Sequence, residues 1–113
     1  MKVVKGTKRR KGRLNMFAKH KRVINKKVIE EIRKSECELC GSRCYAQPHH
    51  IHTVGSGGGD IRENLIQLCV DCHIGAHDGR ISKKQLIDAV AKREGLSPTE
   101  IHRINRRAMG YDV

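Results

Sequence analysis

The sequence predicts a small α+β protein that depends on a bound metal for its stability. Residues 45–51 and 65–68 are expected to form two short strands, and helical patterns lie on both sides of them. Two Cys-x-x-Cys pairs flank this region and can supply four thiolates to one ion. With 113 residues, no Trp and 3% aromatic side chains, the chain has room for one domain with a thin core, which a metal or a disulfide would have to reinforce.

The excess positive charge is concentrated in the first third of the chain. Residues 1–34 contain 14 of the 24 Lys and Arg and 2 of the 12 acidic residues, whereas the remainder contains 10 of each sign. The whole net charge of +12 therefore belongs to this N-terminal part. Such an arrangement is typical of proteins that bind a polyanion, so nucleic acid is the first candidate partner and an anionic membrane surface the second.

Residues 1–24 are interpreted as a basic arm. The first 13 residues lack periodicity, and they contain a dense cluster of five bases, namely Lys8, Arg9, Arg10, Lys11 and Arg13. We expect this cluster to bind the phosphates of a nucleic acid. The alternative is a solvated tail that only aids solubility.

The cysteine count and the absence of targeting signals predict a cytoplasmic protein that does not enter membranes. No run of about 7 to 15 apolar residues follows the basic start, and no segment is long enough to span a bilayer. Five cysteines, an odd number, argue against a disulfide framework. Reduced thiolates that bind metal are the better interpretation.

Residues 25–80 are expected to form the central unit, which begins with an amphipathic helix. In the segment 25–34, Val28 and Ile32 continue a spacing of four that begins at Ile24, with Ile29 beside them, while charged residues occupy the other faces. This pattern predicts a helix whose apolar side packs on the domain and supports the basic arm.

The cysteine pairs are Cys37/Cys40 and Cys69/Cys72, and we expect the four thiolates to bind one structural zinc ion. Disulfide pairing is the second alternative. The 28 residues between the pairs exceed the roughly 15 to 20 of a simple zinc ribbon, so a further unit is inserted there. Cys44 remains unassigned and is expected to be a buried thiol rather than a ligand.

Several histidines occupy the predicted strand and the helix that follows the second strand. Successive strand residues point to opposite faces, so His49 and His50 should face different ways, and His52 is expected at the surface or facing DNA. The glycine-rich stretch 55–59 lacks the Lys-Ser/Thr of a phosphate-binding loop, so we interpret it as a flexible turn. A helix beginning near residue 70 would carry His73 and His77 on one face.

Residues 81–113 predict a pair of helices. Ser82 with Gln85, and Ser97 with Glu100, form two capping boxes, and Gly95 ends the first helix. The pair resembles a helix-turn-helix except that an acidic residue, at position 94, stands where an apolar one is usual. We favour a plain helical hairpin that completes the core, although the basic outer face of the second helix leaves contact with DNA open.

Taken together, the cysteine pairs and the residues between them resemble the HNH endonuclease family over about residues 37–77. The positions that carry this resemblance are Cys37, Cys40, His49, His50, Gly58, Gly59, Asn64, Leu65, Cys69, Cys72, His73 and His77. The resemblance implies a ββα-metal fold, in which two strands and a helix hold one divalent ion.

The resemblance also implies a role for each polar residue of the motif. His49 and His73 would bind the catalytic ion, His50 would be the general base, and Asn64 would hold the loop and orient that base. His77 matches a position where some members have a further histidine near the ion or the scissile phosphate. The all-histidine set is similar to that of bacteriocin-type nucleases and leaves magnesium, manganese and transition ions open.

Elementary chemistry agrees with the role of His50. An imidazole with an ordinary pKa of about 6.5 is partly neutral at physiological pH and can accept a proton from water. Its second ring nitrogen needs an acceptor, for which we expect a nearby backbone carbonyl.

The resemblance thus implies a DNA endonuclease that cuts double-stranded DNA to leave a 5′-phosphate and a 3′-hydroxyl. It further implies a phage or mobile-element product, such as a homing or packaging-associated nuclease, that works as a monomer or homodimer in a bacterial or phage-infected cell. The alternative is a non-catalytic zinc-ribbon module that binds nucleic acid, although such a module has no use for paired histidines and Asn64.

Overall fold

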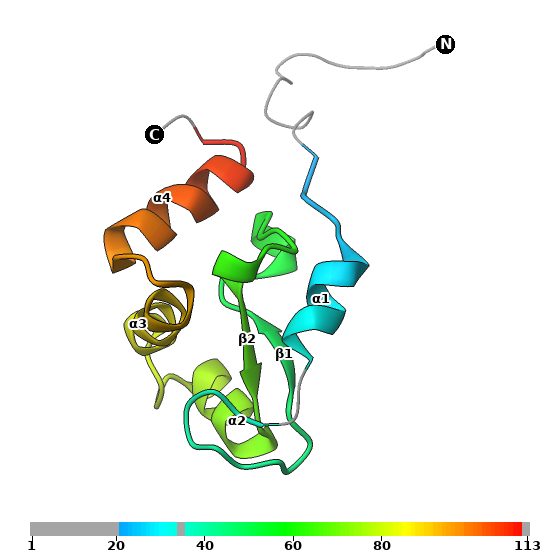
Figure 1. The fold of residues 1–113 in the computed structure, drawn as a ribbon, viewed down its shortest axis with the longest axis vertical. Helices are drawn as coiled ribbons and strands as arrows, with labels where there is room; N and C mark the ends of the chain where they lie inside the picture. The colour runs from blue at the N-terminus through cyan, green and yellow to red at the C-terminus, as the bar shows by residue number, and fades with distance from the viewer. Residues whose placement is uncertain (1–20, 34–35, 112–113) are drawn as a thin grey trace.

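The computed structural model describes residues 21–33 and 36–111 and confirms the predicted α+β class. A two-stranded sheet lies at the centre, with helices around it (Figure 1). The basic cluster expected to bind phosphate lies outside the described residues. The helices are α1 (Lys26–Ile32), α2 (Val70–Asp78), α3 (Lys83–Glu94) and α4 (Pro98–Ala108), and the strands are β1 (Gln47–His50) and β2 (Leu65–Leu68).

The two strands pair antiparallel, with His49 opposite Ile66 and His50 opposite Leu65. All four residues of β2 are buried, so this strand forms the centre of the molecule. β1 is shorter than the predicted strand at both ends. Tyr45 adopts a positive φ of 50°, which no strand residue does, and the chain bends again after His50.

The connection between the strands, residues 51–64, contains two short 3-10 helices, Val54–Ser56 and Arg62–Asn64. The second half of its glycine-rich stretch is buried, which makes our prediction of a flexible turn wrong there. A Cβ atom on Gly58 would lie 1.8 Å from the carbonyl oxygen of His52. Glycine is required at this position because two backbone segments pass too close for any side chain.

α1 begins later and ends earlier than predicted, and residue 34 lies outside the described part of the chain. Asn25 is extended and caps the helix, its side chain accepting from the N–H groups of Lys27 and Val28. Ile24 therefore precedes the helix and is 69% exposed, so it is not part of the apolar stripe as expected. Ile32 is the buried residue of this helix.

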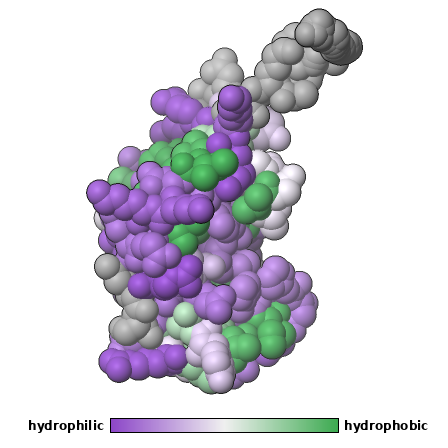
Figure 2. Space-filling view, turned by 90° about the vertical axis from the view of Figure 1, so that its right-hand side faces the viewer, coloured by the Kyte–Doolittle hydropathy of each residue, from purple (hydrophilic) through white to green (hydrophobic). Residues whose placement is uncertain are grey.

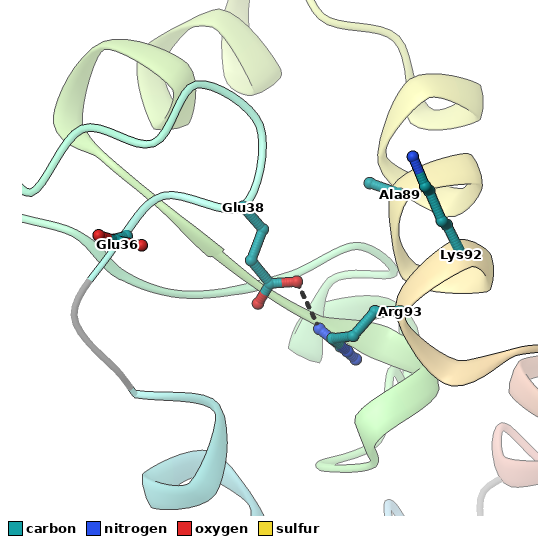
Figure 3. Close-up of a pocket in the computed structure, with 5 residues that line it drawn as sticks. All are labelled: Glu36, Glu38, Ala89, Lys92 and Arg93. Carbon is teal, nitrogen blue, oxygen red and sulfur yellow. Dashed lines mark hydrogen bonds and ion pairs between the residues drawn. The ribbon is translucent and has the colours of Figure 1, made fainter.

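The loop that carries the first cysteine pair is fixed to the C-terminal helices by an ion pair. Arg93 of α3 points toward Glu38 of the loop, and the two form an ion pair at 2.7 Å (Figure 3). Arg93 also donates hydrogen bonds to the carbonyl oxygens of Arg62 and Leu65. One side chain thus joins the cysteine loop, the inter-strand connection and α3.

Both predicted capping boxes are present, at Ser82 of α3 and Ser97 of α4. The two helices are joined by residues 95–97, and Gly95 takes the left-handed conformation that ends α3. In Figure 1, α3 is seen nearly along its axis while α4 runs across the view, so the two cross steeply. The core lies between these helices and the sheet; its buried apolar members are Cys37, Ile51, Ile66, Leu68, Cys69, Leu86, Val90, Ala91 and Ile101.

The surface is mainly polar on the side where α1 lies. Figure 2 shows this face as hydrophilic, with small, separate apolar patches. Ile24 and Val23, which are exposed, belong to the segment just before α1. Among the described helices, none has both the length and the apolar character needed to cross a bilayer.

Candidate metal centres and catalytic residues

The four cysteines of the two pairs come together where β2 meets α2. The Sγ atoms of Cys37, Cys40, Cys69 and Cys72 all lie within 4.8 Å of one another, and none is in a disulfide. A tetrahedral zinc ion with Zn–S bonds of about 2.3 Å would need sulfur atoms roughly 3.8 Å apart. The cluster therefore fits the zinc site that the spacing predicted, and disulfide pairing is wrong.

The chemistry of these thiols also suits a cation. Burial alone would raise the pKa of the Cys37 thiol, but N–H groups, first that of Cys69, lower it to about 7. Burial and the neighbouring thiols raise the pKa of Cys72, because several thiolates this close repel one another. A divalent ion between them would remove that repulsion.

Cys44 lies outside this cluster, and our prediction of a buried thiol is wrong. Its side chain is exposed, because the chain turns at residues 44 and 45 with Tyr45 at positive φ. The backbone of Cys44, rather than its side chain, contributes to the structure. Its carbonyl oxygen accepts a hydrogen bond from the N–H of Val70, the first residue of α2.

Three histidines from β1 and α2 form a second cluster. Ligand nitrogens of His49, His73 and His77 lie within 4.8 Å of one another, and the ring centroids are 4.8 to 5.4 Å apart. The spacing of four along α2 places His73 and His77 on one face, as expected, and that face meets His49. His77 is therefore an equal member of the group.

The histidine cluster also fits a divalent ion. Burial, followed by the neighbouring imidazoles His73, His77 and His50, lowers the pKa of His49 to about 4. Burial and His77 likewise lower the pKa of His73. These two rings are neutral at physiological pH and can offer lone pairs to a metal. The site opens into a hollow of about 240 Å³, lined by Pro48, His49, His50, Thr53, Val54, His73 and His77.

His50 lines the same hollow but turns its ring toward a carboxylate. Its Nε2 lies 2.8 Å from Oδ1 of Asp60, a residue that is 2% exposed. We expected a backbone carbonyl as the acceptor, and the structure places this buried carboxylate there instead. Because an ionised carboxylate can only accept, Nε2 is the protonated nitrogen in the neutral form of the ring, and Nδ1 then carries the lone pair.

Asp60 is itself held by the segment that precedes α1. Arg22 donates to Oδ1 of Asp60 at 2.7 Å and to the carbonyl oxygen of Gly58 at 3.0 Å, and the N–H of Asn25 donates to Oδ2. Burial would raise the pKa of Asp60, but the hydrogen bonds from Arg22, His50 and Asn25 lower it to about 2. The carboxylate is therefore ionised at any physiological pH.

Asn64 fastens the two ends of the glycine-rich connection. Its side-chain oxygen accepts from the N–H of His52, and its nitrogen donates to the carbonyl oxygens of His52 and Gly59. The residue is fully buried, so these bonds are shielded from water. This geometry fixes the loop between His50 and Asp60.

His52 does not face outward as expected. Its ring is partly buried, and its Nε2 has no hydrogen-bond partner among the described residues. Burial, followed by the positive charges of Lys83 and His102, lowers the pKa of His52. The ring thus lies toward the C-terminal helices, because the chain bends after His50 and the strand alternation ends there.

Sequence reasoning missed Asp60 and Arg22. Asp60 is one of two acidic residues between His50 and Asn64, and it directly follows the glycines, which was the available signal. Arg22 stood among many bases of the arm, and nothing in the sequence distinguished it.

The strand–strand–helix unit thus carries two clusters of metal-binding side chains, one of three histidines and one of four cysteines. Residues 37–79 match the family model described as HNH endonuclease, the family that the motif resembles.

The chain is also similar to the type IV methyl-directed restriction enzyme EcoKMcrA of Escherichia coli (strain K12). The two are 33% identical over 64 residues, which cover 49% of this chain and 23% of that enzyme. The similarity thus spans less than a quarter of the relative. No solved structure matched the chain.

Proposed function

We propose that this protein is a metal-dependent endonuclease that hydrolyses phosphodiester bonds in double-stranded DNA. The observation that supports the proposal best is the convergence of three imidazoles within 4.8 Å, beside a fourth, His50, that lines the same hollow. The match to the HNH endonucleases and the similarity to a restriction enzyme support the same class of reaction and substrate.

His49, His73 and His77 would hold the catalytic ion. Three imidazoles suit zinc, nickel, cobalt or manganese better than magnesium, which prefers oxygen ligands. When bound, such an ion polarises the phosphate and stabilises negative charge on the leaving oxygen. The neutral state of His49 and His73, which burial maintains, keeps the site ready for a cation near pH 7.

His50 would act as the general base. Asp60 accepts a hydrogen bond from the protonated Nε2 of His50. The lone pair then lies on Nδ1, which can take a proton from a water molecule in the hollow. Attack of that water on phosphorus, in line with the 3′-oxygen, would break the P–O3′ bond and give a 5′-phosphate, and the leaving 3′-oxygen would take a proton from solvent water to become the 3′-hydroxyl. The proton moves to Nδ1 of His50, and the positive charge that forms on the ring lies beside the Asp60 carboxylate.

Asp60, Arg22 and Asn64 would act as positioning residues. Asp60 sets the tautomer and the orientation of His50, while Arg22 holds Asp60 in its ionised state. Asn64 keeps the loop that presents Asp60 in one conformation through three hydrogen bonds. Arg22 also belongs to the basic arm, whose bases Lys8, Arg9, Arg10, Lys11 and Arg13 would bind the DNA backbone.

The proposal is tested by cleavage of supercoiled plasmid in the presence of manganese, cobalt, nickel, zinc or magnesium. The wild-type protein should nick the plasmid with at least one of these ions. His50→Ala should be slower by about 10²- to 10⁴-fold, the usual contribution of a general base.

Two measurements keep this test interpretable. The zinc content of His50→Ala should equal that of the wild type, because His50 belongs to neither cluster, and circular dichroism should show that the variant stays folded although Asp60 loses one hydrogen bond. Equal nicking by both proteins would remove His50 as the base. No nicking by the wild type with any ion, together with retained DNA binding, would instead identify a zinc-ribbon binding module.

A further inference from the structure

Helix α4 lies along the connection that joins the two strands of the nuclease core. The side chain of Asn105 donates to the carbonyl oxygen of Glu63 at 2.9 Å, and His102 is close enough to His52 to lower its pKa. At the other end of the helix, the Cβ of Ala108 lies 3.8 Å from the position that a Cβ on Gly59 would take. α4 therefore borders the same loop that carries Asp60.

The last residues of the basic arm also lie against the loop that carries Asp60. The Cβ of Val23 lies 3.1 Å from that Gly59 position, and the N–H of Asp60 donates to the carbonyl oxygen of Val23. Figure 1 shows the C-terminal end of α4 and the segment before α1 at the same end of the molecule. Positive charge on α4 would thus continue the positive charge of the arm.

The arginines of α4 form no ion pairs. Within residues 21–33 and 36–111, no ion pair involves Arg103, Arg106 or Arg107, whereas the other arginines are paired. Arg106 stacks on the ring of Tyr111, and Arg103 and Arg107 are exposed. The nearest acids act only in part: Glu100 accepts from the N–H of Ser97 and also feels the charge of Arg103, and Glu63 lines a hollow with Arg103 and Arg107.

Arg103 and Arg107 lie four residues apart and share one outer face of α4. Their Cβ atoms are about 5 to 6 Å apart by helical geometry. On the inner side, Ile101 and Asn105 are buried against the core, so α4 is held rigidly. α3 and α4 are joined by three residues, a connection compatible both with a helix-turn-helix and with the plain helical hairpin we favoured.

We propose that the outer face of α4, through Arg103 and Arg107, is a second DNA-binding surface that contacts the phosphate backbone of the duplex. The inference rests on the proposed function for the identity of the ligand, and on charge complementarity for the surface. Two exposed guanidinium groups that form no ion pair suit phosphates, which they can bind with two hydrogen bonds each. The arm and α4 would then hold the duplex from two places around the loop of Asp60.

The test compares DNA binding by the full-length wild type and by Arg103→Gln/Arg107→Gln. Fluorescence anisotropy of a labelled duplex of about 20 base pairs is recorded at several salt concentrations, without added divalent ion. Binding is thus read independently of cleavage. We expect the double variant to bind on the order of tenfold more weakly, and the slope of log K against log salt to fall by about 2, roughly one for each lost phosphate contact.

The matched control is Arg43→Gln/Lys92→Gln, which removes the same charge near the cysteine loop. Arg43 pairs with the exposed Glu36, and Lys92 lines a hollow with Glu36 and Glu38, so neither belongs to α4. This control should keep the wild-type slope and affinity within about twofold.

Equal losses in both double variants would show that only net charge matters and would overturn the proposal. Unchanged binding by Arg103→Gln/Arg107→Gln, with unchanged zinc content, would also overturn it and would leave an acidic protein as the partner of this face. If no plasmid is cleaved but the α4 variant still binds DNA more weakly than its control, the nuclease assignment fails while the surface stands.

Discussion

The cysteine cluster and the histidine cluster differ in how the chain holds them. The cysteine cluster includes two buried residues, Cys37 and Cys69, and Cys69 also caps α2. The histidines line an open hollow, and His77 is exposed. The cysteine cluster is therefore partly buried and forms part of a helix cap, whereas the histidine cluster is open to solvent.

This difference indicates a division of work between two ions. A metal at the cysteines would join the loop at residues 37–40 to the start of α2, because two of its ligands come from each segment. A metal at the histidines would meet a rigid frame, because β1, α2 and the Asp60 loop are already fixed by backbone pairing and buried hydrogen bonds. We therefore expect loss of the first to unfold the domain and loss of the second to leave it folded.

The largest effect should follow from breaking the cysteine cluster. Cys40→Ser should lose zinc and unfold at 37 °C, because structural zinc supplies free energy comparable to the whole 5 to 15 kcal/mol stability of a small domain. Zinc analysis and circular dichroism measure the loss. Cys44→Ser is the matched control, and since Cys44 is exposed and outside the cluster, it should change neither. Equal behaviour of the two variants would disprove the four-cysteine assignment.

A smaller effect is expected where the Asp60 loop passes close to β1. Gly58→Ala would place a Cβ 1.8 Å from the carbonyl oxygen of His52, so the loop must shift and should cost about 3 kcal/mol. Gly55→Ala is the control, since nothing lies within 4 Å of its Cβ position. Urea unfolding of the two variants should differ clearly, and similar midpoints would mean that the loop adapts freely.

The Asp60 carboxylate should contribute roughly 2 kcal/mol at pH 7, because hydrogen bonds hold its pKa at about 2 against an ordinary 3.8. Since the folded-state pKa is lowered, this contribution is complete above about pH 4 and disappears as the pH falls toward 2. Asp60→Asn should therefore be less stable than the wild type by roughly 2 kcal/mol at pH 7, where the thiolates can still hold zinc.

Urea unfolding at pH 7 measures this difference, with Asp88→Asn as a control that should change stability by less than about 0.5 kcal/mol because its ion pair with Lys84 is exposed. Equal unfolding midpoints for the wild type and Asp60→Asn would contradict the role of the carboxylate.

Much of the fold could be predicted, because the sequence patterns that determine it each lie within a few residues. The cysteine spacing, the two capping boxes and the start of α2 are each encoded within a few residues, and the structure confirms them. The grouping of His73 and His77 followed from helical spacing.

What the sequence did not reveal depends on contacts between distant segments. Arg22 and Asp60 are 38 residues apart, and their ion pair forms because the segment before α1 crosses the glycine-rich loop. The exposure of Cys44 and the short first strand follow from the positive φ of Tyr45, a conformation that its residue type does not suggest. β1 ends at His50, so the alternation of strand faces does not extend to His52, and its ring is partly buried rather than exposed.

The central claim is that imidazoles bind one metal ion while thiolates bind another. Titration of the zinc-loaded protein with cobalt or nickel, followed by calorimetry, tests it most directly. We predict one additional equivalent in the wild type, binding weakened by more than about tenfold in His77→Ala, and no change in His102→Ala, which removes an exposed histidine outside the cluster. The same affinity in His77→Ala and the wild type, or no second equivalent in either, would contradict the account.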